Sequence, residues 1–375
     1  MKTPEDILAQ LISFPSVVGT ANHDIVEWIR TYLTELGAKV SVLPGPEGDR
    51  SNLFATIGPV DQPGIILSGH MDVVPAAEPA WTSNPFILRR EDDRLYGRGT
   101  SDMKGFLACA LAALPAIASQ PLSRPLHLAF SYDEEAGCRG VPHLISRLPD
   151  VCAKPEGCIV GEPSGLRAIR AHKGKAAVRI EISGRAGHSS RPDLGRNAIH
   201  AMAEIVAEAV HAADALTEGP FDGNFEPPYS SLQVGTIAGG QAVNIIPDRC
   251  TIELEARAVA GVDPSRLLSG IEAKLESLTE RGFKTRWEVL SAYPALSLKD
   301  DARLAVLLRD LTGQEPLPAV SYGTEAGLYQ AAGIDAIICG PGDIARAHKA
   351  DEYIEIGELA ACRTMIEALG QRLRA

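Results

Sequence analysis

Histidine and carboxylate side chains follow several apolar runs of the chain, each just beyond the point where the run ends. His70 comes after the run 65–67, and His348 follows a glycine- and proline-containing loop beyond the run 337–338. The other members of this group are acidic: Asp72, Asp102, Glu134, Glu135 and Glu162. Imidazole and carboxylate donors without thiolates suit Zn²⁺, Co²⁺ or Mn²⁺ in an open catalytic site. One carboxylate could bridge two such ions about 3.5–4 Å apart, which together would activate water and polarise a carbonyl.

Each of these residues also has an ordinary structural explanation. A His-x-Asp pair arises by chance in a chain with nine histidines, and the Glu134-Glu135 pair could be a solvated turn. Glu162 could cap a helix, and His348 could be a plain loop residue. Two adjacent carboxylates directly after a buried strand are unfavourable, however, unless positive charge offsets them. Ligands of α/β folds gather at the carboxyl ends of strands, so the coincidence of five such loops favours a metal site.

The elements that must position these residues alternate between helix and strand in the first part of the chain. Helical spacing covers 3–12, 22–36 and 104–119, and strand patterns cover 39–43, 52–57, 64–68, 126–131 and 157–160. Such alternation predicts a mostly parallel sheet with helices on both faces. The same pattern resumes with a helix at 302–311, a strand at 336–339 and a helix at 357–373.

Between these two parts the pattern changes to β-α-β-β-α-β. The strands are expected at 176–182, 231–238, 250–258 and 284–289, and the helices at 197–212 and 264–281. This order is the split βαβ arrangement of a small, ferredoxin-like antiparallel domain. We therefore expect a discontinuous catalytic domain formed by 1–172 and 290–375, and an inserted domain formed by 173–289.

Composition and charge exclude several classes of protein. A chain of 375 residues is long enough for two domains, and its hydrophobic fraction of 45% is that of a folded globule. The net charge of −12 argues against nucleic acid or an anionic membrane as the main partner. No apolar run is long enough for a membrane span, and the acidic start is unlike a secretory signal. Seven scattered cysteines without a CxxC pair fit reduced thiols, which predicts a cytoplasmic protein.

Several motifs in one order along the chain carry a resemblance to a known family. They are 68–75 (SGHMDVVP), 96–105 (YGRGTSDMKG), 133–135 (DEE), 161–164 (GEPS), 171–174 (AHKG), 187–190 (GHSS), 244–248 (NIIPD) and 340–342 (GPG). With these motifs the chain resembles the M20 family of dinuclear zinc amidohydrolases, and within it the acetylornithine deacetylases. The narrower resemblance depends on fewer residues, mainly 172–199 and 323–327 (GTEAG).

The resemblance implies a set of metal ligands and a second layer behind them. His70 and Glu162 would bind one zinc ion, Glu135 and His348 would bind the other, and Asp102 would bridge the two. Asp72 is expected to accept the second ring N–H of His70, which fixes the tautomer of that ligand. The family also has a cis peptide after the bridging acid, which is here the Asp102–Met103 bond. Two Zn²⁺ ions per subunit are implied, with Co²⁺ as a possible substitute.

The resemblance further implies how catalysis would proceed. Glu134 would be the general base that takes a proton from water and later passes it to the leaving amine. His188 has an ordinary explanation as a loop residue, but in this family the corresponding histidine reaches the site of the other subunit and stabilises the oxyanion. Homodimerisation through the inserted domain is therefore part of the expectation.

Substrate-binding residues are predicted from residue type. Asn244 and Arg257 lie in the inserted domain, and Arg257 could bind a substrate carboxylate or form a surface ion pair. Glu325, which follows Gly323 and Thr324, could meet a cationic amine of the substrate or simply begin a helix.

The implied reaction is hydrolysis of N2-acetyl-L-ornithine to acetate and L-ornithine in arginine biosynthesis. Within the family, N-succinyl-diaminopimelate desuccinylase and other aminoacylases or peptidases remain alternatives, as does a metal-free binding protein on the same scaffold. A dinucleotide-dependent oxidoreductase is disfavoured because Asp102 stands where the glycine motif needs its third glycine. The chain contains neither a P-loop nor a G-x-S-x-G serine hydrolase motif.

Overall fold

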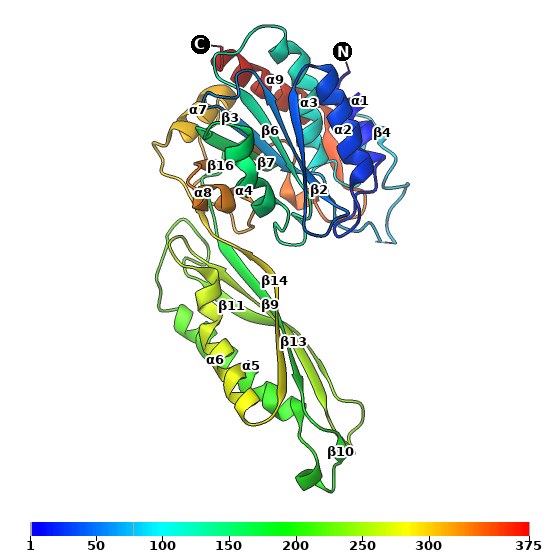
Figure 1. Ribbon diagram of the computed structural model, residues 1–375, viewed down its shortest axis with the longest axis vertical. Coiled ribbons are helices and arrows are strands. Elements are labelled where there is room, and N and C mark those ends of the chain that lie inside the picture. Colours follow the sequence, from blue (N-terminus) through cyan, green and yellow to red (C-terminus); the bar gives the residue numbers. More distant parts are fainter. Residues whose placement is uncertain (1, 78, 375) are drawn as a thin grey trace. The chain divides into compact units, whose positions relative to one another are not determined.

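The computed structural model describes residues 2–77 and 79–374, and the chain divides into two compact units (Figure 1). Unit 1 comprises Met1–Ala171, Leu296–Ala319 and Thr324–Ala375, and unit 2 comprises His172–Ala295 and Val320–Gly323. The inserted unit ends at Ala295 and not at the predicted residue 289, because strand β14 (Lys284–Tyr293) continues past residue 289. The return of four residues, Val320–Gly323, to unit 2 has no counterpart in the sequence pattern.

Unit 1 contains a six-stranded sheet among its described residues. Its order is β1 (Lys39–Pro44), β2 (Ser51–Ile57), β6 (Leu126–Ser131), β3 (Ile65–His70), β7 (Gly157–Pro163) and β16 (Ala336–Gly340). The last four strands are parallel to one another, while β2 pairs antiparallel with both β1 and β6. Strands β3, β6, β7 and β16 are buried along their whole length, as strands covered on both faces should be.

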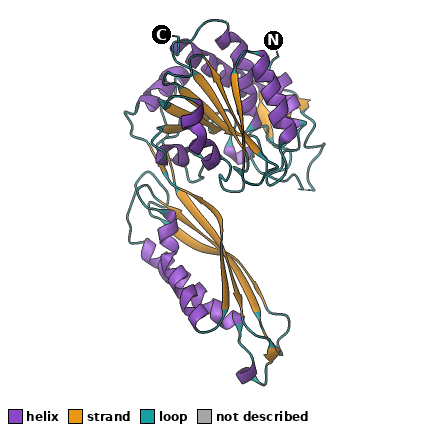
Figure 2. Cartoon of the chain, in the orientation of Figure 1, coloured by secondary structure: helices purple, strands orange, loops and turns teal. Residues whose placement is uncertain are grey.

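Helices cover both faces of this sheet (Figures 1 and 2). The helices of unit 1 are α1 (Pro4–Ile12), α2 (His23–Glu35), α3 (Lys104–Ala118), α4 (Val141–Val151), α7 (Arg303–Thr312), α8 (Ala326–Ala331) and α9 (Ile356–Arg372). The Ala- and Leu-rich α3 is almost entirely buried, because it contacts α1 and α9 as well as the sheet. Helices α4 and α8 pack on the other face. This mainly parallel sheet flanked by helices confirms the predicted fold class.

Short elements complete unit 1. A three-stranded sheet has the order β17 (Tyr353–Glu355), β5 (Arg94–Tyr96) and β4 (Arg89–Glu91), and a 3₁₀ turn covers η3 (Ile344–Arg346). Strands β8 (Ala171–His172) and β15 (Leu296–Ser297) lie where the chain passes between the units. Among the described residues, no helix combines the length and apolar character that crossing a membrane requires.

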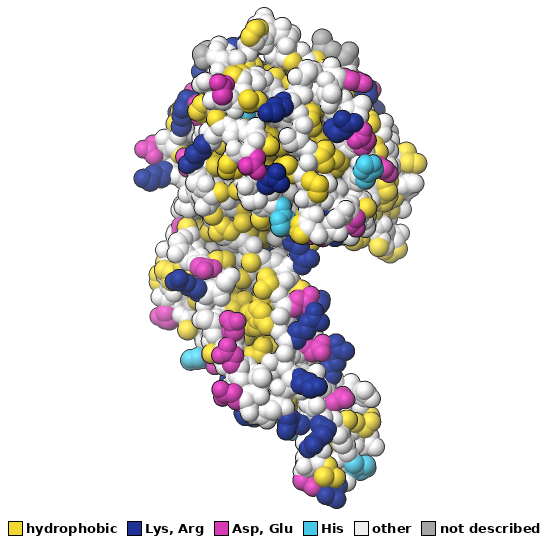
Figure 3. Space-filling model, viewed as in Figure 1, with side chains coloured by type: hydrophobic (Ala, Val, Ile, Leu, Met, Phe, Trp, Pro, Cys, Tyr) yellow, Lys and Arg dark blue, Asp and Glu magenta, His cyan; other side chains and the backbone are white. Residues whose placement is uncertain are grey.

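Unit 2 is a four-stranded antiparallel sheet with two helices on one face. The strand order is β11 (Ser231–Gly239), β13 (Arg249–Ala258), β9 (Gly174–Ser183) and β14, and the helices are α5 (Ala198–Leu216) and α6 (Ser269–Glu280). Even-numbered residues of β13 are buried against the helices, which is the alternation of a half-buried strand. Acidic and basic side chains, such as the pair Arg179 and Glu253, are interspersed along the strand side (Figure 3).

Short elements at the two ends of the unit 2 sheet include segments that carry predicted site residues. At the end of the sheet where β9 finishes lie β10 (Gly187–His188), η1 (Pro192–Leu194) and β12 (Ile245–Ile246), whereas η2 (Pro264–Leu268) follows β13 at the opposite end. Strand β10 pairs with β12, so that His188 lies opposite Ile245.

Candidate active site and metal centre

Parallel pairing brings the predicted ligands of unit 1 to one edge of its sheet. His70 is the last residue of β3 and lies opposite Ser131, the last residue of β6. Glu162 is on β7, which is parallel to β3 and to β16. The loops that leave these strands therefore emerge side by side, as ligand-binding loops of α/β sheets do.

Two groups of donor atoms form at this edge. Ligand atoms of His70, Asp102 and Glu162 lie within 4.8 Å of one another, and so do those of Asp102, Glu135 and His348. In the first group, Nε2 of His70 is 3.1 Å from Oδ1 of Asp102 and 3.9 Å from Oε1 of Glu162. In the second, Nε2 of His348 is 3.0 Å from Oε1 of Glu135 and 3.3 Å from Oδ2 of Asp102.

Asp102 belongs to both groups and presents one carboxylate oxygen to each. This is the geometry that a carboxylate needs in order to bridge two cations, and the donor set of imidazole and carboxylate groups fits divalent ions such as zinc. The Asp102–Met103 peptide bond is cis, as the family resemblance implies.

Electrostatics at this edge favour bound cations. Burial would raise the pKa of Asp102, but hydrogen bonds with His348 and His70 hold it well below its usual range. Bonds with Asp102 and Glu135 raise the pKa of His348 to about 10. Burial, together with nearby Asp102 and Glu134, raises the pKa of Glu162 well above its usual value. Carboxylates crowded in a partly buried site repel one another, and divalent cations would relieve this repulsion.

Asp72 supports the site in a different way from the one expected. Nδ1 of His70 lies 2.8 Å from the backbone carbonyl oxygen of Asp72 and 3.6 Å from its carboxylate. The carboxylate instead accepts the backbone N–H groups of Glu134 and Glu135, each at 3.1 Å. Asp72 is thus the residue that faces Nδ1 of His70, with its backbone carbonyl as the nearer acceptor and its carboxylate as the more distant one.

Glu134 lies beside the donor groups and belongs to neither of them. Burial and the neighbouring Glu135 and Asp72 carboxylates raise its pKa to about 8, although His70 acts in the opposite direction. Cations bound at the two groups would lower this pKa and favour the ionised form. The preceding residue, Asp133, has a φ of 50°, and it holds the turn by accepting the N–H of Gly19 at 2.8 Å. Strained backbone of this kind concentrates at functional sites.

Glu325 is not where a substrate amine could reach it. Its side chain is 1% exposed, and its two carboxylate oxygens accept hydrogen bonds from Ser68 on β3 and Ser131 on β6. Thr324 is also buried, and its hydroxyl accepts the N–H of Ala326 at the start of α8. The expectation that Glu325 meets the substrate is thus replaced by a structural role beneath the sheet edge.

Unit 2 carries the other predicted site residues. His188 and Asn244 are exposed and lie on neighbouring segments, since the N–H of Ser189 donates to the carbonyl of Asn244 at 3.1 Å. Nδ1 of His188 accepts the backbone N–H of Ser190 at 3.2 Å, a group that can only donate. In a neutral imidazole the proton therefore sits on Nε2, which leaves an N–H that can serve an external acceptor.

Arg257 and Gly323 form a second cluster in unit 2, around Tyr293. Nη1 of Arg257 is 3.3 Å from the Tyr293 hydroxyl, and its Nε is 3.2 Å from Oε1 of Glu255. A side chain at position 323 would overlap the Tyr293 ring, so only glycine allows this approach. Arg257 therefore has an internal acidic partner, and its guanidinium is only partly exposed.

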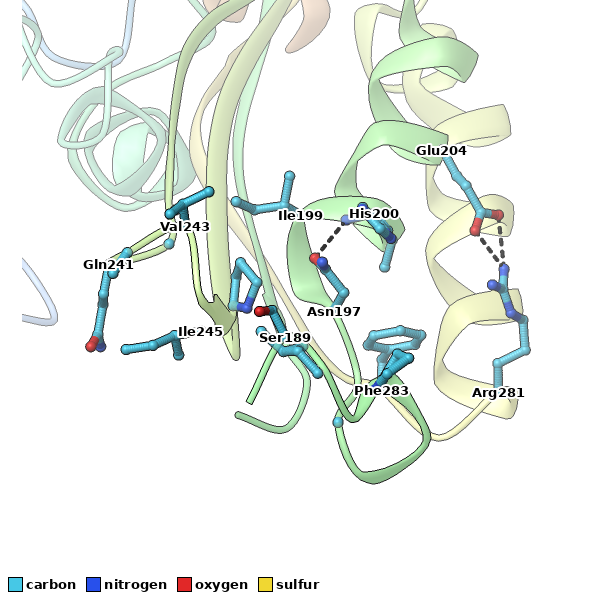
Figure 4. A pocket seen from close by; sticks show the side chains of 18 residues that line it. Ser189, Asn197, Ile199, His200, Glu204, Gln241, Val243, Ile245, Arg281 and Phe283 are labelled. Atoms are coloured by element: carbon cyan, nitrogen blue, oxygen red, sulfur yellow. Dashed lines mark hydrogen bonds and ion pairs between the residues drawn. The ribbon is translucent and has the colours of Figure 1, made fainter. Parts of the chain in front are cut away.

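A pocket of about 880 Å³ lies at the end of unit 2 that carries β10 and β12 (Figure 4). Its walls include Ser189 beside His188, Val243 and Ile245 on either side of Asn244, and Asn197, which caps α5 by accepting the N–H of His200. Val243 is fully exposed, and Ile237 on β11 is 59% exposed. This end of unit 2 thus combines a hollow with uncovered apolar side chains.

Sequence reasoning missed three buried groups that hold the site together. The hydroxyls of Ser68 and Ser131 donate to the Glu325 carboxylate. The third group is the Glu352 carboxylate, which accepts backbone N–H groups of the loop that carries Asp102. One signal could have found the last of these. Arg98 stands in the motif 96–105 that carries Asp102, and an arginine so close to a predicted metal ligand calls for an acidic partner of its own.

Comparison with known proteins gives a consistent family. The sequence profile of "Peptidase family M20/M25/M40" matches residues 66–372. An acetylornithine deacetylase of Photorhabdus laumondii is 34% identical over 373 residues, covering 97% of this chain and 95% of that protein. An acetylornithine deacetylase of Proteus mirabilis is 33% identical over 380 residues, covering 98% and 95% respectively.

Solved structures share the fold. An M20 family metallo-carboxypeptidase from Sulfolobus solfataricus matches with a TM-score of 0.80 at 19% identity, covering 99% of both chains. A dinuclear metal-binding M20 peptidase from Bacillus subtilis matches with a TM-score of 0.67 at 15% identity, covering 99% of this chain and 97% of that one. Together with the profile and the relatives, these likenesses establish that the chain belongs to the metal-dependent amidohydrolases of peptidase family M20/M25/M40.

Proposed function

We propose that this chain hydrolyses the amide of N2-acetyl-L-ornithine to acetate and L-ornithine, a reaction of arginine biosynthesis. The observation that carries the proposal is the similarity to proteins named acetylornithine deacetylase, which extends over 95% of their length at 33–34% identity. The geometry of unit 1 supports an amidohydrolase, since two donor groups share Asp102 and a further acid lies beside them.

We propose two Zn²⁺ ions per subunit, for which Co²⁺ can substitute. His70 and Glu162 would hold one ion, Glu135 and His348 the other, and Asp102 both. When bound, such a pair lowers the pKa of water and polarises the carbonyl of the amide.

Glu134 is the residue to which we assign proton transfer. Its carboxylate accepts a proton as water attacks the acyl carbon, and the C–O bond forms. The same proton then passes to the nitrogen as the C–N bond breaks, so ornithine leaves with a neutral amine and the acyl group leaves as acetic acid, which ionises in water. Asp72 keeps Glu134 in place by binding its backbone N–H.

His188 is assigned to the oxyanion that develops on the carbonyl oxygen. The Ser190 contact leaves its Nε2–H as a donor, and such a donor contributes about 2.7–4 kcal/mol in comparable sites. We propose that His188 acts on the partner subunit of a homodimer. The uncovered Val243 and Ile237 and the free edge of the unit 2 sheet at β11 support an interface at this end.

Substrate recognition is assigned to unit 2. Arg257 would bind the α-carboxylate of the substrate as a two-point donor, with Tyr293 fixing the guanidinium. Asn244, which lies beside His188, would add a polar contact from the partner subunit. Gly323 gives Tyr293 the room that this arrangement requires.

A substrate panel tests the function. Purified protein loaded with Zn²⁺ or Co²⁺ is assayed against N2-acetyl-L-ornithine, N-succinyl-diaminopimelate and N-acetylmethionine, and kcat/KM is compared. We expect acetylornithine to be preferred. A more than tenfold preference for the succinyl compound would instead assign a desuccinylase, and one for acetylmethionine an aminoacylase. Failure to bind metal or to turn over any substrate would favour a binding protein on this scaffold.

A further inference from the structure

Glu352 is a buried acid in the segment that carries His348, and the mechanism above does not use it. Its side chain is 1% exposed, and its two oxygens accept four hydrogen bonds. Oε1 accepts the backbone N–H of Ser101 at 2.9 Å and that of Asp102 at 3.0 Å. Oε2 accepts the backbone N–H of Gly99 at 3.0 Å and Nη1–H of Arg98 at 2.9 Å. A carboxylate has about four acceptor positions, so Glu352 is fully used by one loop.

This loop is the one that ends at the shared carboxylate. Glu352 fixes the backbone nitrogen of Asp102, and the side chain of Asp102 then reaches His70 with one oxygen and His348 with the other. A displacement of the Asp102 backbone would move both oxygens together. The contact is therefore placed where it controls both donor groups at once.

Two further contacts join the same segments. The backbone carbonyl of Glu352 accepts the N–H of Gly97 at 3.0 Å, and the Ser101 hydroxyl accepts the N–H of Asp343 at 3.2 Å. The Asp102 loop is thus attached at several points to the chain between Asp343 and Glu352, which includes His348. Two of the three donors in the second group, Asp102 and His348, are held relative to each other by protein contacts alone.

Charge alone does not explain this arrangement. Arg98, also 1% exposed, neutralises Glu352 and donates to the backbone carbonyls of Lys349 and Pro75. The ion pair between Arg98 and Glu352 would neutralise the buried charge even if no backbone N–H group bound Glu352. The convergence on Gly99, Ser101 and Asp102 indicates a positional role.

We propose that Glu352 is a positioning residue of the metal centre, which sets the Asp102 carboxylate between the two donor groups through the backbone of residues 99–102. The proposal rests on metal binding at this site, and it does not depend on which acyl amino acid is hydrolysed. Groups behind metal ligands typically change metal affinity or activity by about 10–100-fold when they are removed.

The test is Glu352→Gln, with Zn²⁺ affinity measured by competition against a chromophoric chelator. The amide keeps the size of the side chain but directs an NH₂ group at backbone N–H donors. The matched control is Glu358→Gln, because Glu358 also accepts an arginine, Arg346 at 2.7 Å, and a backbone N–H, that of Glu355 at 2.9 Å. Arg346 lies in η3, two residues before His348, and Glu355 caps α9, so the described contacts of Glu358 include no backbone N–H group of residues 99–102.

We expect Glu352→Gln to weaken Zn²⁺ binding by about tenfold or more, and Glu358→Gln to leave it within about twofold. Thermal unfolding of both variants is recorded in parallel. Equal Zn²⁺ affinity of Glu352→Gln and the native protein would overturn the proposal, as would an equal loss in both variants.

A second variant covers the case in which Glu352→Gln does not fold. Glu352→Asp keeps the charge but is one methylene shorter, and we expect it to fold and to bind Zn²⁺ several-fold more weakly. If both variants fail to fold while Glu358→Gln folds, Glu352 is a folding determinant and the proposal is wrong. Because the chelator assay uses no substrate, its result is independent of the substrate panel.

Discussion

Asp72→Asn isolates one contact on which the catalytic geometry depends. The two Asp72 oxygens accept the backbone N–H groups of Glu134 and Glu135, each at 3.1 Å, and thereby fix both the assigned base and a metal donor. Asparagine keeps the shape and one acceptor oxygen. Its NH₂ group faces the second N–H, so one charge-assisted hydrogen bond is lost.

The magnitude follows from that single bond. Hydrogen bonds to charged groups contribute about 1.5–3 kcal/mol. If this energy is expressed fully in the transition state, kcat falls by about 10- to 150-fold, since about 1.36 kcal/mol corresponds to a factor of ten. KM should change less, because Asp72 does not contact the proposed substrate groups.

The assay is steady-state hydrolysis of acetylornithine with metal content determined in the same samples. The control is Asp263→Asn, because Asp263 also accepts a backbone N–H, that of Ser265 at 2.9 Å, but lies in unit 2 before η2. A kcat for Asp72→Asn within about threefold of the native value, at full metal content, would refute the positioning argument.

Three further predictions concern stability and assembly. Burial lowers the pKa of His127 on β6 from 6.5 to about 4, so the folded protein holds the imidazole neutral. As the pH falls from about 6.5 towards 4, only the unfolded chain takes up a proton at this residue, and the free energy of unfolding therefore decreases. The free energy of unfolding, measured by urea denaturation, should decrease from pH 7 to pH 5 by about 2 kcal/mol less in His127→Gln than in the native protein. The same decrease in both proteins would contradict this prediction. Gly161→Ala should lower the free energy of unfolding by about 1–3 kcal/mol, because the added methyl group would overlap the Phe106 ring, and an unchanged urea midpoint would show that the ring can move. Val243→Asp should convert the proposed dimer to monomer in light scattering and reduce turnover with it, whereas an intact dimer would move the interface elsewhere.

The positions of the two groups of candidate donors were predictable because they depend on local signals. A short apolar run marks each buried strand, and parallel strands present their carboxyl ends at one edge, so His70 and Glu162 had to lie close together. The split βαβ order of the inserted domain was visible for the same reason, since the alternation in β13 is a property of neighbouring residues.

Contacts between distant segments were not predictable in this way. The Glu352 carboxylate meets the Asp102 backbone across 250 residues of chain, and the Glu325 carboxylate meets Ser68 across 257. Nothing in the spacing of Glu325 distinguishes an acid that begins a helix at the surface from one buried beneath a sheet. The nearer acceptor of the His70 ring, the Asp72 carbonyl, was not predictable either, because the choice between carbonyl and carboxylate depends on the path of the 133–135 loop.

The assignment of Glu134 as the proton-transfer residue is the central claim, and Glu134→Ala tests it most directly. Metal content per chain and turnover of acetylornithine are measured on the same preparation. Because Glu134 is in neither donor group, about two Zn²⁺ ions per chain should be retained while kcat falls by about 10²–10⁴-fold. Turnover within tenfold of the native protein at full metal content would contradict the account, as the proton would then have to move through another group.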